Sequence, residues 1–275
     1  MSRLRIRLFA VTLLLAGMAG FGVAQSAVLF EDDFEAYASG SNLNGQGGWV
    51  GTGVNLVNTA THLSGTSLLG PPNSGIRQLN LFGHSVGGAL AAGGIYTLSF
   101  DVYAQTTSPL THSSGLGVGN AAASGAGSFT GSAMWVPVEY AYNGFGWRFD
   151  ARQLTGGAND YQTIAGGYNA LRSLDLVVDA VAMEIYGRFD FGAGLTETTH
   201  YAINLSQLAG IDAVAGYADY RGQNGGATTP WGHSFSNAEY DNIVFSSNAV
   251  SGAVPVLPVW GLLLIGFLSP ALRRR

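Results

Sequence analysis

The sequence predicts an all-β fold, a single β-sandwich that lies between two apolar terminal segments. Glycine makes up 41 of the 275 residues, and serine, threonine, asparagine and alanine are abundant, which is typical of turn-rich β proteins. Apolar and polar residues alternate with a period of two over most of the chain, as they do in half-buried strands. Residues 28–250 are enough for one sandwich with a full core, so we expect one domain there.

The amino-terminal segment has the three regions of a secretory signal peptide. Arginines at positions 3, 5 and 7 precede an apolar run over residues 8–23, and small residues follow. We expect a signal peptide over residues 1–26, cleaved between Ala24 and Ala27, with the Sec translocon and signal peptidase as partners. An uncleaved anchor is the alternative, but the run is short and contains three glycines.

The carboxy-terminal segment predicts a transmembrane helix. Residues 254–272 contain no charge, and at about 1.5 Å of rise per residue they nearly match a hydrocarbon core of about 30 Å. Three arginines follow, and positively charged flanks stay on the cytoplasmic side. The domain before the helix would then lie outside.

Residues 254–275 form a tripartite ending, in which prolines and arginines flank the apolar segment. This ending resembles the sorting signals of the PEP-CTERM class, although it reads Val-Pro-Val-Leu-Pro where that class has Val-Pro-Glu-Pro. The resemblance implies an exosortase-type membrane protease as partner. It also implies transient anchoring in the inner membrane, then release to the cell envelope or outside. The sorting residues would be Pro255, Pro258, Arg273, Arg274 and Arg275.

Charge and cysteine content exclude several classes of function. The domain holds all 17 acidic residues but only six arginines and no lysine, a formal charge of −11. Such a surface repels phosphate backbones and argues against nucleic acid as a partner. Without cysteine, the domain has neither disulfides nor thiolate metal sites.

Alternating patterns predict strands at residues 95–104, 201–205, 211–220 and 238–245, and one or two strands at 174–191. Asn143-Gly144 between two alternating runs predicts a tight hairpin. With a two-residue turn, Tyr140 faces Trp147 and Glu139 lies opposite Arg148. Other pairs on the aromatic side are Tyr142 with Phe145 and Val138 with Phe149.

The two ends of the domain carry short motifs. Asp33-Phe34-Glu35 with Gly48-Trp49 opens it, and a Tyr-Asp-Asn strand at residues 240–242 closes it. The pair resembles concanavalin A-like (laminin G-type) jelly rolls of exported bacterial proteins. The resemblance implies a jelly-roll sandwich whose first and last strands are neighbours.

If those strands are neighbours, acidic residues of both ends meet. Glu31 and Asp33 would then join Asp241 and backbone carbonyls in a hard-oxygen site for structural calcium. Loop acids that bind no metal are the commoner alternative. The five histidines have no spacing typical of zinc.

A polar face along one strand is the candidate ligand site. Glu184, Tyr186, Arg188 and Asp190 are two residues apart, so they share one surface. Tyrosine can stack on a sugar ring while the charged groups bind hydroxyls, which suits an extracellular polysaccharide. A binding site should gather Tyr186 with Trp231 or Trp49 around one concavity, whereas a solvated face of a structural protein would leave them buried or dispersed.

Gly83 to Gly87 matches the nucleophile elbow of serine hydrolases and resembles the serine-bearing turn of lipases, with Ser85 as nucleophile. Fewer than two helical turns follow before the next strand, and no alternation of strands and helices surrounds the motif. Candidate partners are Asp175 or Asp179 and His200 or His233. We therefore expect a non-enzymatic envelope or matrix protein that binds polysaccharide, with a purely structural protein as the alternative and a serine hydrolase as the less favoured one.

Overall fold

A computed structural model describes residues 26–52, 56–59, 63, 65–70, 78–104, 111–120, 135–141, 146–151, 161–164, 170–190, 194–221 and 238–249. Residues 1–25 of the predicted signal peptide and the whole predicted carboxy-terminal segment, with the sorting prolines and arginines, lie outside these ranges, and so do Trp231 and His233. Within them, no helix is long and apolar enough to cross a bilayer. Ser26–Asn248 forms one compact unit.

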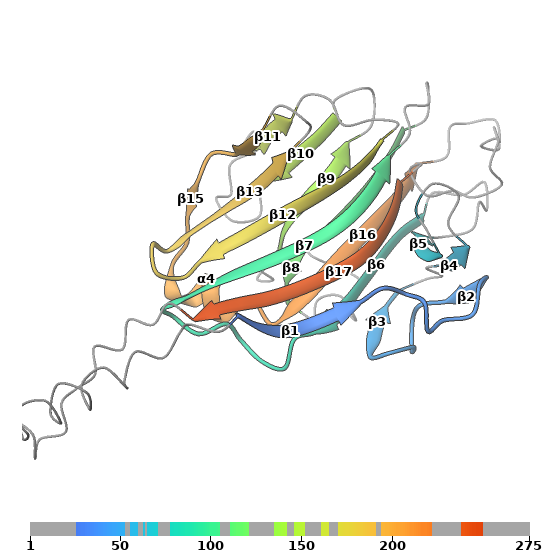
Figure 1. The fold of residues 1–275 in the computed structure, drawn as a ribbon, viewed down its shortest axis with the longest axis horizontal. Helices are drawn as coiled ribbons and strands as arrows, with labels where there is room; N and C mark the ends of the chain where they lie inside the picture. The colour runs from blue at the N-terminus through green and yellow to red at the C-terminus, as the bar shows by residue number, and fades with distance from the viewer. Residues whose placement is uncertain are drawn as a thin grey trace, which may run out of the picture. The chain divides into compact units, whose positions relative to one another are not determined.

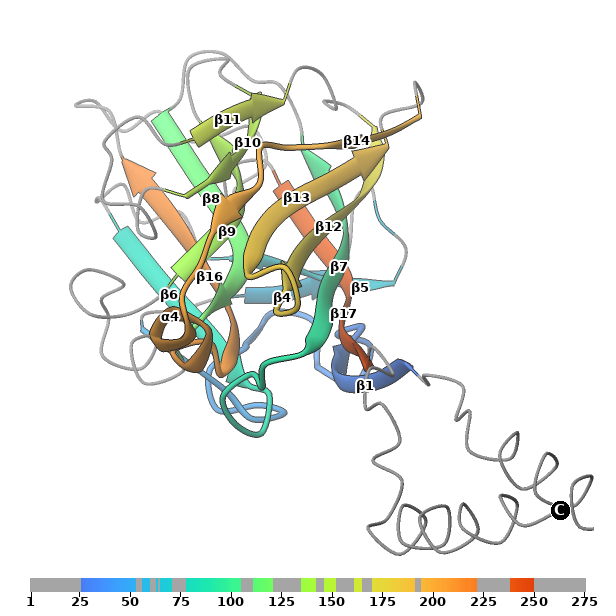
Figure 2. The same ribbon diagram turned by 90° about the vertical axis from the view of Figure 1, so that its left-hand side faces the viewer.

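Two antiparallel sheets make up this unit, as Figures 1 and 2 show. The larger sheet has the order β14-β13-β12-β7-β17-β5-β4-β2, with β1 joined to β17 and β15 joined to β13. The smaller sheet has the order β11-β10-β9-β8-β16-β6-β3. The predicted all-β sandwich is confirmed, and the buried apolar side chains form one cluster.

The strands of the larger sheet are β1 (Ser26–Asp32), β2 (Ser41–Asn42), β4 (Leu56–Thr59), β5 (Thr66–Gly70), β7 (Gly94–Ala104), β12 (Leu171–Asp179), β13 (Glu184–Asp190), β14 (Leu195–Glu197), β15 (Tyr201–Ala202) and β17 (Ala238–Ala249). Those of the smaller sheet are β3 (Trp49–Gly51), β6 (Gln78–Ser85), β8 (Thr111–Gly119), β9 (Trp135–Ala141), β10 (Gly146–Asp150), β11 (Tyr161–Ile164) and β16 (Ala213–Arg221). One short helix, α4 (Leu205–Ala209), follows β15.

Strand β7 shows how the sequence pattern sets the fold. Its even positions, Tyr96, Leu98, Phe100 and Val102, are buried, while the odd positions between them are only half-buried. Successive side chains of a strand point to opposite faces, so one face packs on the core and the other faces outward. The predicted half-buried strand is confirmed.

The first and last strands are neighbours, as expected. β1 pairs antiparallel with β17, from Ser26 opposite Asn248 to Asp32 opposite Ile243. Asn242 has a positive φ of 49° and interrupts the alternation of β17 between the buried Tyr240 and Ile243. Asn is among the residues that tolerate this conformation best.

The predicted hairpin register is confirmed for the described residues. Tyr140 is level with Trp147, Glu139 with Arg148, and Val138 with Phe149. The turn itself, with Tyr142, Asn143, Gly144 and Phe145, lies outside the described residues.

The predicted strand over residues 201–205 is wrong beyond Ala202. Asn204 instead caps α4: its side chain accepts a hydrogen bond from the Gln207 backbone N–H, and the Gln207 side chain accepts one from the Asn204 N–H. This reciprocal cap satisfies two N–H groups of the first turn and starts a helix where alternation had suggested a strand.

Candidate functional site

The candidate ligand face lies on β13 in the larger sheet. Glu184, Tyr186 and Arg188 are partly exposed and Asp190 is exposed, while the residues between them are buried. The pairing of β13 with β12 and β14 brings further polar side chains beside them. The prediction that these four residues share one surface is confirmed.

At the centre of this face, Tyr186 stacks on His200. The two rings are parallel, with centroids 3.9 Å apart. His200 lies just before β15, which pairs with the start of β13 and so brings this histidine over the strand. No local sequence pattern predicts this contact, because the two residues are 14 positions apart and meet only through the pairing of β13 with β15.

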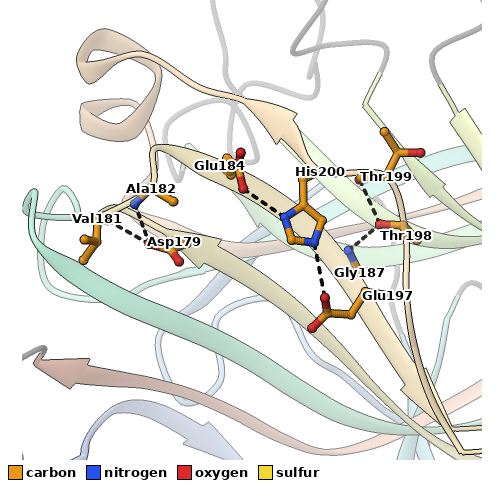
Figure 3. Close-up of polar contacts among 9 residues, drawn as sticks. All are labelled: Asp179, Val181, Ala182, Glu184, Gly187, Glu197, Thr198, Thr199 and His200. Atoms are coloured by element: carbon orange, nitrogen blue, oxygen red, sulfur yellow. Dashed lines mark hydrogen bonds and ion pairs between the residues drawn. The ribbon is translucent and has the colours of Figure 1, made fainter.

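Two carboxylates hold the His200 ring in place, as Figure 3 shows. Nδ1 lies 2.9 Å from Glu184 Oε2, and Nε2 lies 3.3 Å from Glu197 Oε2. The pKa of His200 is raised mainly by the hydrogen bond to Glu184; burial, the next largest effect, lowers it, and the hydrogen bond to Glu197 raises it by less. Burial instead raises the pKa of Tyr186. The arrangement therefore favours a cationic imidazole of His200 that stacks on a neutral phenol ring of Tyr186.

Arg188 pairs with Asp175 on the neighbouring strand. Its Nε and one terminal nitrogen donate to Asp175 Oδ2 at 3.1 and 2.8 Å, and Ser99 Oγ donates to the other oxygen at 2.6 Å. At the ends of the face, Asp190 accepts the Gly194 N–H. Asp179 accepts the N–H groups of Val181 and Ala182 (Figure 3). These contacts fix the side chains before any ligand arrives.

The expected gathering of tryptophan around Tyr186 is not found for Trp49. Trp49 is buried in the core, and its Nε1 donates to Asp32 Oδ2 at 2.6 Å. The same carboxylate accepts the Tyr37 hydroxyl at 2.7 Å and, through its other oxygen, the Phe34 N–H at 2.8 Å. Trp49 is therefore a structural residue at the opening turn, and His200 is the aromatic partner of Tyr186.

The three predicted calcium residues do not form a metal site in the described part of the chain. Asp33 accepts the N–H of Glu35, Glu31 is exposed on β1, and Asp241 is buried on β17. In the part of the chain that the structure describes, no group of three or more acidic or histidine side chains could hold a metal ion. The pairing of β1 with β17 is right, but the three side chains of the predicted set are not arranged as one cage.

Asp241 nevertheless lies in an unusual environment. Its pKa is raised to about 6, chiefly by burial. The Asn242 N–H that it accepts lowers the pKa, and the nearby carboxylates of Glu35, Asp101 and Asp33 contribute smaller increases. On the adjacent strand β5, the buried Ser67 hydroxyl has no hydrogen-bond partner. Carboxylate and hydroxyl oxygens are donors that calcium accepts, so the chemistry suits the ion although the geometry is incomplete.

A separate cleft of about 680 Å³ lies beside β1. Its lining includes Glu31, Asp33, Tyr37, His84 and Asn242. The two ring nitrogens of His84 lie 2.7 Å from the Ser85 carbonyl and 2.8 Å from the Gly47 carbonyl, which fixes the ring. Like the β13 face, this cleft brings polar and aromatic side chains together.

The GHSVG stretch is the end of strand β6. Ser85 Oγ accepts the Gly87 N–H at 3.3 Å, and no helix is formed over residues 86–93. The described residues that were suggested as catalytic partners of Ser85 contact other groups. Asp175 pairs with Arg188, Asp179 accepts a backbone N–H of the following turn, and His200 contacts Glu184. Among the described residues, the proposed triad members do not meet at Ser85.

Comparison with known proteins bears on the fold. No protein-family model matches the chain, and no curated protein matches it. An endo-1,3-beta-glucanase from Streptomyces sioyaensis is 11% identical with a TM-score of 0.53, and the match covers 82% of this chain and 97% of that one. Lectin II from Ulex europaeus is 11% identical with a TM-score of 0.53, covering 82% and 100%. A lectin from Bauhinia forficata in complex with GalNAc is 10% identical with a TM-score of 0.51, covering 82% and 98%.

At these identities the likeness concerns architecture alone. The order of strands in two packed antiparallel sheets, with the first and last strands side by side, agrees with it. The chain therefore folds as a jelly-roll β-sandwich similar to those of legume lectins.

Proposed function

We propose that this chain is an exported protein of the cell envelope or extracellular matrix that binds a polysaccharide, without catalysis, on the β13 face. The terminal segments support export through the Sec translocon and sorting by an exosortase-type protease. The fold supports binding only by analogy with lectins, since a fold does not determine a function.

The stacked pair of Tyr186 and His200 is the observation that carries the proposal. Sugar recognition combines an aromatic surface with hydrogen-bonding groups at its edge, and this pair is flanked by Glu184, Glu197 and Arg188. The contacts with the two carboxylates hold the His200 ring in one position before the ligand binds. Little further side-chain entropy is therefore lost at this residue on binding. With a formal charge of −11, the domain favours neutral over anionic polysaccharides.

A glycan array probed with the exported domain tests the proposal. Tyr186→Ala should abolish a signal that the unchanged domain gives, because it removes one ring of the pair. Val50→Ala is the control, since Val50 is an exposed apolar side chain on β3 of the smaller sheet, away from the β13 face. Asn242→Ala tests the cleft beside β1. If Asn242→Ala abolishes binding and Tyr186→Ala does not, the binding site is the cleft and not the β13 face.

A purely structural role is the second candidate, and one observation favours it. The polar groups on the β13 face bind one another, and Trp49 is buried and not part of any binding surface. An array without any signal, together with unaltered assembly of the matrix by the Tyr186→Ala protein, would favour this role over polysaccharide binding.

A further inference from the structure

At one end of the sandwich, three segments of the described chain contain no Asp, Glu, Arg, Lys or His: residues 86–94, 180–183 and 203–210. Asp212, whose carbonyl accepts the Val86 N–H at 2.9 Å, lies beside them. Backbone hydrogen bonds join them: the Gly93 N–H to the Ala180 carbonyl at 3.2 Å, and the Ile203 N–H to the Met183 carbonyl at 2.9 Å. We call these three segments the end cap; Figure 1 shows α4, the start of β7 and the β12–β13 turn together there.

The end cap exposes apolar side chains. Leu205 is 66% exposed and Val181 is 54% exposed, and Ala89, Ala91 and Ala92 are exposed as well. The nearest carboxylate of the β12–β13 turn, Asp179, is tied to the turn's own backbone. The polar side chains of the end cap are uncharged: Asn204 and Ser206 are exposed, and Gln207 is half-buried. An exposed apolar surface without charge of its own is typical of a contact region.

Exposed leucines elsewhere lie in a different setting. Leu195 is 65% exposed but pairs with Asp190, and Leu171 is followed by Arg172. The feature that distinguishes the end cap is therefore its lack of charge and not the exposure of single apolar side chains, which is normal on soluble surfaces.

The chain enters and leaves the sandwich at this same end. Tyr96 stacks near Phe245, and Phe100 lies near Tyr240, so residue numbers rise along β7 as they fall along β17. The last residues of β17 therefore lie beside the start of β7, which belongs to the end cap. Ser26, where β1 begins, is opposite Asn248.

The chain between β17 and the apolar carboxy-terminal segment is short, which limits the distance between the end cap and a membrane anchor formed by that segment. Five residues, 249–253, separate Asn248 from the apolar segment that begins at Val254. Fully extended, they span at most about 18 Å, at roughly 3.3–3.6 Å per residue. If residues 254–272 enter a bilayer, the end of the sandwich that carries the end cap is held close to its surface.

We propose that the end cap rests on the lipid surface while the carboxy-terminal segment anchors the chain. This inference rests on the anchoring part of the proposed function, not on polysaccharide binding. Removal of exposed apolar side chains from water favours the contact. The acidic remainder of the domain disfavours anionic lipids, so zwitterionic lipids are the expected partners.

Spin labels on single cysteines test the proposal, since the chain has no cysteine of its own. The full chain is reconstituted in phosphatidylcholine vesicles with a label at Val181→Cys or Leu205→Cys. Leu195→Cys is the control on the domain, and Leu263→Cys reports on the anchor. Collision with oxygen, which concentrates in lipid, is compared with collision with a water-soluble nickel chelate.

The expected result is a several-fold higher ratio of oxygen to nickel collisions at positions 181 and 205 than at 195, together with a lipid-exposed label at 263. Phosphatidylglycerol, added to the vesicles, should lower the ratio at 181 and 205 but not at 263. A lipid-exposed label at 263 with aqueous labels at 181 and 205 overturns the end-cap contact alone. An aqueous label at 263 overturns anchoring and this inference together, while the glycan array still tests polysaccharide binding. Broadening of the spectrum by interaction between spin labels at 181 or 205 would show that the end cap contacts a second copy of the chain. That result also overturns the proposed contact with lipid.

Discussion

Replacement of Asp241 by asparagine should make the domain less sensitive to pH. Asp241 is 3% exposed, and its pKa in the folded state is raised from 3.8 to about 6. Between these two values the folded state binds more protons than the unfolded state, so this group adds stability at low pH that is lost as pH rises through about 6. Asn keeps an acceptor for the Asn242 N–H but cannot ionise.

The size of the effect follows from the shift. One pKa unit corresponds to about 1.4 kcal/mol. Through this group, the free energy of unfolding of the unchanged domain should therefore fall by about 2–3 kcal/mol between pH 4 and pH 7. Urea unfolding of the unchanged domain and of Asp241→Asn, with a chelator present, measures it as the difference between the two proteins at each pH. Other groups titrate in both proteins and cancel in that difference.

Asp190→Asn is the matched control, because it makes the same change on an exposed carboxylate. If Asp241→Asn destabilises the domain at pH 7 as much as at pH 4, the raised pKa is wrong. A calcium arm extends the test: stabilisation by calcium at pH 7 that Asp241→Asn abolishes would support the calcium hypothesis, because a bound cation favours the ionised carboxylate that burial otherwise penalises.

Three further predictions follow from the structure and the sequence. Gly216→Ala should destabilise the domain by about 1–3 kcal/mol in urea unfolding, since its Cβ would lie 2.4 Å from the Phe82 ring; unchanged stability would contradict this packing. In histidine NMR titrations, Glu184→Gln should lower the pKa of His200 more than Glu197→Gln does, and the reverse order would contradict the assigned contacts. Neutral residues at positions 273–275 should disturb sorting in cell fractionation without unfolding the domain, and normal delivery would count against the sorting signal.

Local alternation was sufficient to predict many strands of the sandwich. A strand with one buried face must place its apolar residues two apart, and β7 and β13 do so without interruption. The β9–β10 register followed from the Asn-Gly turn, because a two-residue turn determines which residues face each other. The short helix α4 was missed because its cap, Asn204 with Gln207, lies within a stretch too short for a helical period to be visible.

The candidate site was predicted only in part, because most of its contacts join distant segments. The common face of Glu184 and Tyr186 follows from one strand, but the position of His200 depends on the pairing of β13 with β15. Trp49, which a binding site was expected to gather with Tyr186 and a structural protein to bury, is buried, and the carboxylate of Asp32 accepts its indole N–H inside the opening turn. Burial of Asp241 likewise depends on neighbouring strands and loops that no local pattern reports.

The two proposals are compatible in one orientation of the domain. Glu184 begins β13 directly after the end-cap segment 180–183, and Asp190 is six residues further, about 20 Å away at roughly 3.3 Å per residue. If the end cap rests on lipid, β13 leads away from the membrane, and the pair of Tyr186 and His200 is held above its surface. A polysaccharide chain on this face would then be bound beside the membrane while the protein is still anchored. Binding measured with the chain in vesicles should therefore equal binding by the free domain, and strong loss of binding in vesicles would contradict this orientation.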